Sequence, residues 1–182
     1  MNTYIAFLRG INVGGYHKVP MTDLKKEFLK LGLVNIETLL NSGNVIFEAI
    51  TEDISTLEKT LSDHLEKVFG FPVPTILRTS ETINELLAAD PFKNETLSKD
   101  MRFYVSFLQK EDNGNLKLPW TSDDNSFRII GKIDRAIISV LDLSISKTPK
   151  AMNVFEKFYG KDVTTRNWKT IERIKTKLED KR

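Results

Sequence analysis

Tyr4-Ile5-Ala6-Phe7-Leu8 is the stretch that decides the fold, because a near copy of it, Tyr104-Val105-Ser106-Phe107-Leu108, stands in the second half of the chain. Both stretches are short runs of aromatic and aliphatic residues, which predict buried strands. A second pair of matching dipeptides, Phe69-Gly70 and Tyr159-Gly160, comes in each half shortly before a strand that begins with valine. We therefore predict an internal duplication.

The first half has the pattern strand, helix, strand, strand, helix, strand, followed by one more helix. Strands are expected over residues 4–8, 36–40, 45–49 and 73–78, and the turn Asn41-Ser42-Gly43-Asn44 joins the second strand to the third. Apolar residues at helical spacing predict two helices that end at Gly32 and Gly70, and residues 81–89 form the third. Ser55 and Glu58 have the spacing of a capping box at the start of the second helix.

The second half repeats this order, with one irregular stretch. Strands are expected over residues 101–108, 128–133, 136–141 and 163–165. One helix is expected with Thr148 as its N-cap and Pro149 as its first residue, running to Tyr159, and another from Trp168 to Leu178. Residues 109–125, where the first helix of this half belongs, lack a helical pattern, so we expect a short or irregular element there. The order predicts the α+β fold class, with two ferredoxin-like (βαββαβ) halves in tandem over residues 1–92 and 93–182.

The composition limits the chemistry that the chain can perform. With 182 residues, 40% of them hydrophobic, the chain can bury a sizeable core. Cysteine is absent, which excludes disulfides, thiolate nucleophiles and cysteine-bound zinc, and His17 and His64 are the only histidines. We therefore expect no metal and no cofactor. The first apolar run is too short for a signal sequence or a membrane span, so we expect a cytoplasmic protein without a membrane partner.

Charge is distributed unevenly along the chain. Residues 1–91 hold 8 basic and 12 acidic side chains, whereas residues 92–182 hold 19 and 13. A basic C-terminal helix can follow the phosphates of a nucleic acid, which makes nucleic acid a candidate partner of this region. The alternative is that its lysines simply form a solvated helix surface. The sequence identifies no protein partner.

The connection from the first strand to the first helix, Leu8 to Lys18, combines three glycines with basic side chains. Its glycines, at positions 10, 14 and 15, fit neither the dinucleotide fingerprint nor the phosphate-binding loop that ends in Gly-Lys-Ser/Thr. Two interpretations are open: an anion site at the helix start, or a connection whose glycines supply positive φ. The candidate ligand-binding residues here are Arg9, Gly10, Asn12, Gly14, Gly15, His17 and Lys18.

Two further segments carry candidate ligand-binding residues. Ser42 and Asn44 lie in the turn of residues 41–44, where turn chemistry also accounts for them. In Thr164-Thr165-Arg166-Asn167-Trp168, Asn167 suits a helix N-cap and Trp168 a core anchor, which leaves Arg166 for an anion. Lys147 is a further candidate ligand-binding residue. It ends a Ser-x-x-Lys sequence, but the companion motifs of that catalytic family are absent.

The chain resembles the bacterial domain-of-unknown-function family 1697 over nearly its whole length. The resemblance is carried by five segments: Leu8–Gly15, Val19–Met21, Asn41–Phe47, Asp90–Phe92 and Thr165–Trp168. It implies an α+β protein of two ferredoxin-like halves and brings no established activity. Members usually have Gln-Ser-Gly-Asn where this chain has Asn41-Ser42-Gly43-Asn44. They often carry a glycine in the segment where this chain reads Asp142-Leu143-Ser144-Ile145.

The leading functional hypothesis is that the protein binds a small anionic, phosphate- or nucleotide-like ligand through the loop from Arg9 to Lys18. One alternative is an adaptor for a protein partner that performs no catalysis. Another is an enzyme acting on a phosphorylated or nucleotide substrate, although no set of residues identifies a reaction. RNA stacking on the sheets is weakly indicated, because Tyr4 and Phe7 fall on opposite faces of their strand.

Overall fold

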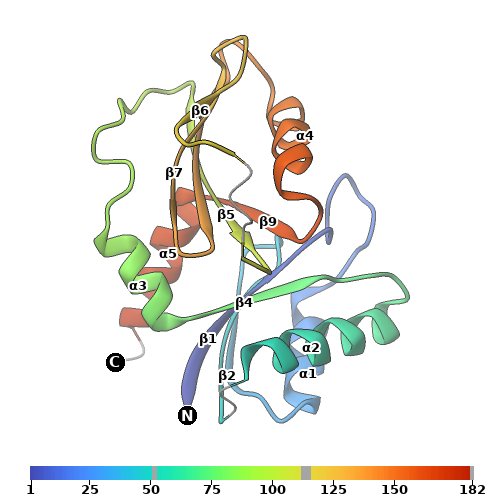
Figure 1. Ribbon diagram of the computed structural model, residues 1–182. Coiled ribbons are helices and arrows are strands. Elements are labelled where there is room, and N and C mark those ends of the chain that lie inside the picture. Colours follow the sequence, from blue (N-terminus) through green and yellow to red (C-terminus); the bar gives the residue numbers. More distant parts are fainter. Residues whose placement is uncertain (51–52, 112–115, 181–182) are drawn as a thin grey trace. The chain divides into compact units, whose positions relative to one another are not determined.

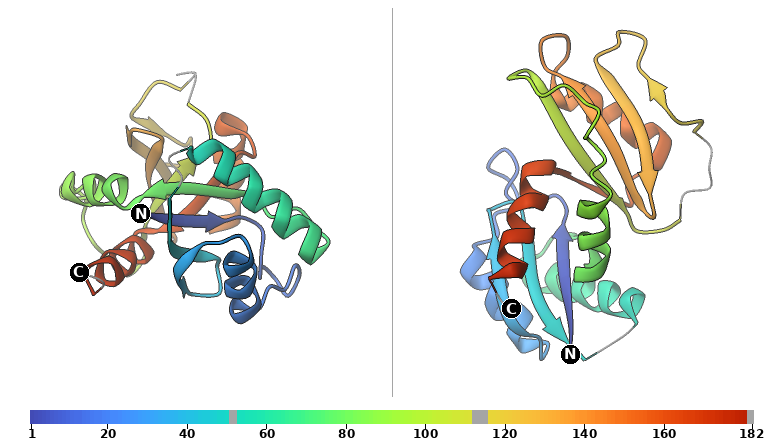
Figure 2. Two further views of the ribbon diagram at one scale, coloured as in Figure 1. Left: turned by 90° about the horizontal axis from the view of Figure 1, so that it is seen from below. Right: turned by 90° about the vertical axis from the view of Figure 1, so that its left-hand side faces the viewer.

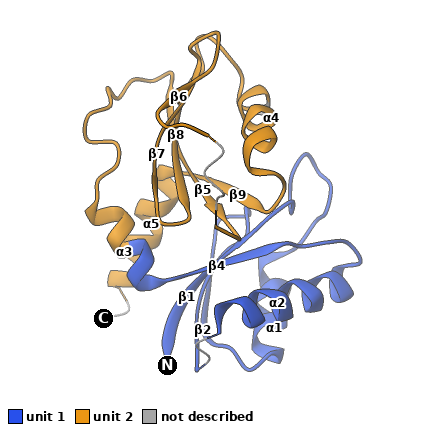
Figure 3. Ribbon diagram, in the orientation of Figure 1, with its two compact units in different colours: residues 1–83 blue, residues 84–182 orange. Residues whose placement is uncertain are grey.

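The computed structural model describes residues 1–50, 53–111 and 116–180 as an α+β protein with two antiparallel sheets and five helices (Figure 1). The chain divides into two compact units, Met1–Ile83 and Asn84–Arg182 (Figure 3). This division falls within α3 (Ser80–Ala88). The duplicated halves drawn from the sequence, 1–92 and 93–182, stay a prediction. Among the described residues, no helix combines the length and apolar character of a membrane span.

Unit 1 is a four-stranded sheet covered by two helices on one face. Its strands are β1 (Asn2–Leu8), β2 (Val34–Leu39), β3 (Asn44–Ala49) and β4 (Thr75–Thr79), in the order β2-β3-β1-β4 with every neighbouring pair antiparallel. Alternate residues of β1 pack in one core with apolar residues of α1 (Met21–Lys30) and α2 (Ile54–Phe69). The strand and helix patterns of the first half thus serve a single core.

Unit 2 is built on a five-stranded sheet. Its strands are β5 (Met101–Leu108), β6 (Trp120–Thr121), β7 (Phe127–Ile133), β8 (Ala136–Asp142) and β9 (Val163–Asn167), in the order β6-β7-β8-β5-β9. Helix α4 (Thr148–Tyr159) lies along one face of this sheet (Figure 2). Its residues Ala151 and Phe155 belong to the core of unit 2. The last helix, α5 (Trp168–Glu179), follows β9 directly.

The two sheets correspond strand by strand when β6 is set aside. Ile5 of β1 lies opposite Arg78 of β4, and Val105 of β5 lies opposite Arg166 of β9 in the same register. Both arginines are buried, and each donates through Nη1 to the carbonyl of the preceding residue. The similarity of Tyr4–Leu8 to Tyr104–Leu108 therefore extends to strand order and pairing.

The units differ in the connection after their first strands, where unit 1 has α1 between β1 and β2. Between β5 and β7, the described residues, 109–111 and 116–126, contain no helix, which confirms for them the prediction of an irregular element. Here the short strand β6 pairs with β7, and Leu116, Leu118 and Trp120 pack against the core of unit 2. These apolar side chains cover core residues without adopting helical spacing.

The start of α2 corrects one sequence prediction. The N-cap is Asp53, whose side chain accepts from the Thr56 N–H, so the Ser55–Glu58 capping box is wrong. Glu58 is instead buried and accepts a hydrogen bond from the Leu77 N–H of β4 at 2.8 Å. Its carboxylate joins a helix to a strand, a contact that helix spacing alone does not reveal.

Candidate functional site

The connection after β1 is a small hairpin. Val13 and Tyr16 form a bridge, and Gly14 and Gly15 between them have φ values of 58° and 83°. Positive φ at both central residues defines the tight two-residue turn for which glycine is favoured. The glycines at the tip therefore have a structural task, independent of any ligand.

Asn12 fastens this hairpin to the rest of unit 1. Its Nδ2 donates to the Val19 carbonyl at 3.0 Å and to the Asn41 carbonyl at 2.8 Å, and its Oδ1 accepts from the Val19 N–H at 2.8 Å. The φ of Asn12 is 55°, a conformation that asparagine tolerates better than most residues. Asn12 thus ties the loop to the turn between β2 and β3.

His17 lies at the base of the hairpin, where its ring stacks on Phe71 with centroids 4.2 Å apart and an interplanar angle of 13°. Its Nδ1 is 3.1 Å from the Gly10 carbonyl oxygen. Because a carbonyl only accepts, Nδ1 carries the proton in this contact, which leaves Nε2 for another partner. The neighbouring Lys18 is exposed.

The turn between β2 and β3 uses its polar side chains internally. Asn44 is completely buried, and its Nδ2 donates to the Leu39 carbonyl at 2.9 Å and to Ser42 Oγ at 3.0 Å. The Leu8 N–H donates to the Gly43 carbonyl at 2.8 Å, which joins this turn to the start of the loop. The predicted residues Arg9 to Lys18, Ser42 and Asn44 therefore all lie in one region of unit 1.

The remaining predicted residues belong to unit 2. Arg166 is buried, its Nη1 donates to Thr164 Oγ1 at 2.8 Å and to the Thr165 carbonyl at 2.9 Å, and burial lowers its pKa to about 10. Asn167 is the N-cap of α5 and accepts from the Lys169 N–H at 3.0 Å, which confirms its predicted capping role. The N-cap prediction at Thr148 is wrong, because Lys147 occupies the N-cap position of α4; its side chain makes no capping hydrogen bond and is exposed.

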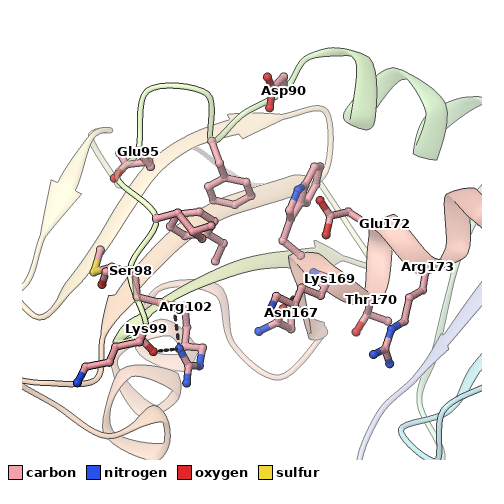
Figure 4. Close-up of a pocket in the computed structure, with 15 residues that line it drawn as sticks. Asp90, Glu95, Ser98, Lys99, Arg102, Asn167, Lys169, Thr170, Glu172 and Arg173 are labelled. Carbon is pink, nitrogen blue, oxygen red and sulfur yellow. Dashed lines mark hydrogen bonds between the residues drawn. The ribbon is translucent and has the colours of Figure 1, made fainter.

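Unit 2 contains a pocket of about 960 Å³ at the start of α5 (Figure 4). Three segments form it: the chain after α3, the beginning of β5, and the first turns of α5. The lining residues are Asp90, Phe92, Glu95, Leu97, Ser98, Lys99, Met101, Arg102, Phe103, Asn167, Trp168, Lys169, Thr170, Glu172 and Arg173. Of the residues predicted to bind a ligand, Asn167 is in this set.

An aromatic cluster forms part of the pocket lining. Phe92 is buried and stacks on Phe103, with centroids 4.7 Å apart and an interplanar angle of 4°. Trp168 meets Phe92 edge to face, at 5.1 Å and 66°. Such ring pairs stabilise beyond their buried area, so this part of the lining is well fixed.

Arg102 is held in the pocket lining by backbone carbonyls. Its Nη1 donates to the Lys99 carbonyl at 2.7 Å and to the Met101 carbonyl at 2.9 Å (Figure 4). Within the described part of the chain, its Nε and Nη2 make no hydrogen bond. The guanidinium therefore keeps one edge for a carboxylate or phosphate, which it can bind with two parallel hydrogen bonds.

Other charges surround this arginine. Lys169 and Arg173 of α5 also line the pocket, and neither forms an ion pair with any residue that the structure describes. Among the acidic lining residues, Glu95 is paired with Arg128 through two hydrogen bonds. The exposed Glu172 also forms no ion pair within the described ranges. The lining is thus mixed in charge, with cations available to an anion.

Comparison with known proteins places the chain in a family. Residues 1–130 match the family described as a protein of unknown function (DUF1697). The chain belongs to the DUF1697 family. No curated protein matches this DUF1697 sequence. The solved structure of the conserved bacterial protein SP0830 from Streptococcus pneumoniae is similar, with 25% identity, a TM-score of 0.65, and coverage of 95% of this chain and 96% of that chain.

Sequence reasoning missed most of the pocket of this DUF1697 protein. Phe92 and Trp168 belong to segments that carried the family resemblance, and this resemblance was the feature of the sequence that pointed to these two residues. Arg102 and Phe103 belong to a strand pattern that already explained them. The family match includes Phe92, Arg102 and Phe103 but ends before α5, so it spans part of the pocket.

Proposed function

We propose that this DUF1697 protein binds a small anionic ligand in the pocket of unit 2. The observation that carries the proposal is the geometry of Arg102, whose Nη1 is fixed by two carbonyls while its other edge is without a partner among the described residues. An arginine that is ordered before binding loses less side-chain entropy when an anion arrives.

The start of α5 supports an anion in the same pocket. Lys169 and Arg173 add positive charge, and the N-terminal end of a helix has a partial positive charge of its own. The pocket combines an apolar, largely aromatic part with many polar and charged side chains, so it offers both kinds of contact to a ligand. These features favour a ligand with an anionic group and an apolar body.

The loop from Arg9 to Lys18 is the second candidate location for the same function. Two side chains support an anion site in this loop. Lys18 is exposed, and the neighbouring His17 uses Nδ1 for the Gly10 carbonyl, so its Nε2 on the other side of the ring can contact a ligand. The hairpin geometry, however, already accounts for Gly14, Gly15 and Asn12. We therefore rank the pocket above the loop.

Thermal unfolding with added anions tests the proposal and separates the two locations. We expect inorganic phosphate or ribose 5-phosphate to raise the Tm in a salt-sensitive way, since a ligand at one hundred times its Kd adds about 2.7 kcal/mol. Arg102→Leu and Arg173→Gln should abolish the increase, whereas Arg9→Ala should not. Lys175→Gln is the matched control, because it removes one charge from the same helix at a position outside the pocket.

The outcomes are distinct. A Tm increase that survives both pocket variants and disappears in Arg9→Ala moves the ligand to the loop. A Tm that no anion changes, over a broad panel, refutes anion binding at both locations. An equal loss in Arg173→Gln and Lys175→Gln identifies a diffuse charge effect and also counts against the pocket.

A second candidate function is that of an adaptor, and the hairpin tip favours it. Val13 is 66% exposed and Tyr16 is 78% exposed, although the hairpin that carries them is held by the bonds of Asn12. Large apolar side chains on an ordered projection suit a protein contact. Tyr16→Ser should then abolish capture of a partner and leave the Tm unchanged.

Two further proposals concern the origin of the fold and the location of the protein. We interpret the shared strand order and register as a duplication of a ferredoxin-like unit, in which the described residues between β5 and β7 of the second copy form no counterpart of α1. We also propose a cytoplasmic location, which the lack of cysteine favours.

A further inference from the structure

We infer that the ligand of the unit 2 pocket is a nucleotide unit, with a planar base on the aromatic cluster and a phosphate at Arg102. This inference rests on the proposed anion binding and adds the identity of the apolar part. It applies to a free nucleotide and to one residue of a single-stranded nucleic acid, since both present a base and a phosphate.

The aromatic cluster provides the surface for the base. Phe92 is the buried centre, and it contacts both Phe103 and Trp168. Phe103 and Trp168 are only half-buried and both line the pocket, so each retains ring surface toward the pocket space. Exposed aromatic surface of this kind stacks on nucleobases of any sequence, because every base has a π face.

The three rings of the cluster come from three separate parts of the chain and are held by their contacts with one another. Phe92 lies in the turn after α3, Phe103 belongs to β5, and Trp168 is the first residue of α5. Asn167, which precedes Trp168, caps the helix and so fixes the direction in which α5 begins. A base would therefore meet a surface that is formed before binding.

Charge in the pocket is arranged to suit both ends of a nucleotide. Arg102 and Lys99 lie on the side of the pocket opposite Asp90, and the acidic Glu172 lies beside Lys169 and Arg173 on α5 (Figure 4). Glu172 stands four residues after Trp168 on α5, so the two side chains share one helix face. A carboxylate beside the stacking surface can accept a hydrogen bond from the amino group of adenine or cytosine.

The size of the pocket agrees with this ligand class. Its volume of about 960 Å³ is at the upper end of the range of about 300 to 1,000 Å³ that is common for small-molecule sites. Inorganic phosphate alone would leave the aromatic lining in water. The uncommitted ring surface is thus explained by a ligand that carries a flat apolar group.

Calorimetry with matched ligands tests the inference. Adenosine 5′-monophosphate should bind roughly 5- to 150-fold more tightly than ribose 5-phosphate, which is what one stacked base contributes. Purine riboside 5′-monophosphate, which has neither the amino group nor an N1–H, should bind more weakly than adenosine 5′-monophosphate. In Glu172→Gln, the preference for adenosine 5′-monophosphate over this analogue should be reduced. Phe103→Leu should reduce the advantage of the base, and Trp168→Phe, which keeps a ring, should largely preserve it.

Fluorescence gives an independent readout. The chain has two tryptophans, so Trp120→Phe leaves Trp168 as the sole reporter. Adenosine 5′-monophosphate should quench Trp168, and ribose 5-phosphate should not. A short single-stranded oligoadenylate distinguishes the sources. Tighter binding than the mononucleotide indicates a nucleic acid, and equal or weaker binding indicates a free nucleotide.

The results separate this inference from the proposed function. If ribose 5-phosphate and adenosine 5′-monophosphate bind equally well, with no quenching of Trp168, the nucleotide inference is wrong and anion binding stands. If neither ligand binds, both are wrong. The assignment of the base to the aromatic cluster is also wrong if Phe103→Leu and the wild type prefer adenosine 5′-monophosphate over ribose 5-phosphate by the same factor.

Discussion

Replacing Gly43 with alanine should destabilise the protein more than the same replacement at Gly70. Gly43 lies in the turn before β3 with φ +74°, and a Cβ there would be 2.8 Å from Leu8 Cβ and 2.7 Å from Ile11 Cδ1. Both neighbours are buried. Ile11 Cδ1 is the end of a flexible side chain and can move, but Leu8 Cβ is attached directly to the backbone of β1, which the sheet holds in place.

The magnitude follows from two costs. The left-handed backbone conformation costs an L-residue about 1 to 2 kcal/mol, and forcing a methyl group into packed space costs about 1 to 3 kcal/mol. Their sum, about 2 to 5 kcal/mol, is a large part of the 5 to 15 kcal/mol by which a typical protein is stable. Gly70 has φ +78° and open space around its Cβ position, so Gly70→Ala has the first cost alone.

Urea unfolding followed by circular dichroism measures both variants. Alanine also restricts the unfolded chain, but this effect is common to the two substitutions and cancels in their difference. We expect Gly43→Ala to lose about 1 to 3 kcal/mol more free energy of unfolding than Gly70→Ala. Equal losses in the two variants would refute the argument, because the contact with Leu8 would then have no energetic consequence.

Three further predictions concern polar side chains. Asp124 accepts hydrogen bonds from Lys150, Ser126 and Ser122, which hold the pKa of its carboxyl well below the ordinary value of 3.8. Asp124→Asn should therefore destabilise the protein at pH 7, and the difference from wild type should shrink as the pH falls below about 4 in unfolding curves, where the unfolded carboxyl is protonated. Glu58→Ala should cost about 1 to 3 kcal/mol in urea unfolding, because it leaves the Leu77 N–H without its acceptor, and wild-type stability in this variant would contradict that contact. Asn12→Ala should increase amide exchange within the hairpin of residues 12–17, since three side-chain bonds are lost, and unchanged protection would show that the hairpin does not depend on them.

The strands and helices were predictable where a local pattern reports burial. Tyr4–Leu8 and the similar Tyr104–Leu108 are short apolar runs that favour a buried strand, and Gly70 marks a helix end by its left-handed conformation. Glu58 shows the limit of such patterns. Its partner, the Leu77 N–H, is 19 residues away, and only the packing of α2 on β4 brings the two together. A capping box was therefore predicted where Asp53 caps the helix.

The candidate site was less predictable, for a related reason. The loop from Arg9 to Lys18 was predicted as the site because its glycines are close together in the sequence. The geometry of the hairpin turn accounts for two of them, Gly14 and Gly15. The pocket residues are dispersed over more than eighty positions. Phe92, Arg102 and Trp168 each satisfy a local pattern, so nothing in the sequence indicated that one surface contains all three.

Comparison of the two units argues that the pocket is more than a consequence of the scaffold. The shared register places Phe103 at the position of Thr3, and Trp168, which follows β9, at the position of Ser80, which follows β4. Counted along the two helices from these residues, Lys169 and Arg173 of α5 correspond to Glu81 and Glu85 of α3.

The shared strand arrangement needs neither rings nor cations at these positions, since β1, β4 and the helix α3 that follows β4 have hydroxyls and carboxylates there. Both helices begin with a side-chain cap, since Thr79 Oγ1 accepts from the Thr82 N–H and Asn167 Oδ1 accepts from the Lys169 N–H. The capped start is thus common to α3 and α5, whereas the exposed side chains are acidic on α3 and basic at the corresponding positions of α5. The cations and the aromatic surface at the start of α5, which the corresponding positions of β1 and α3 lack, are what the proposed anionic, ring-bearing ligand requires.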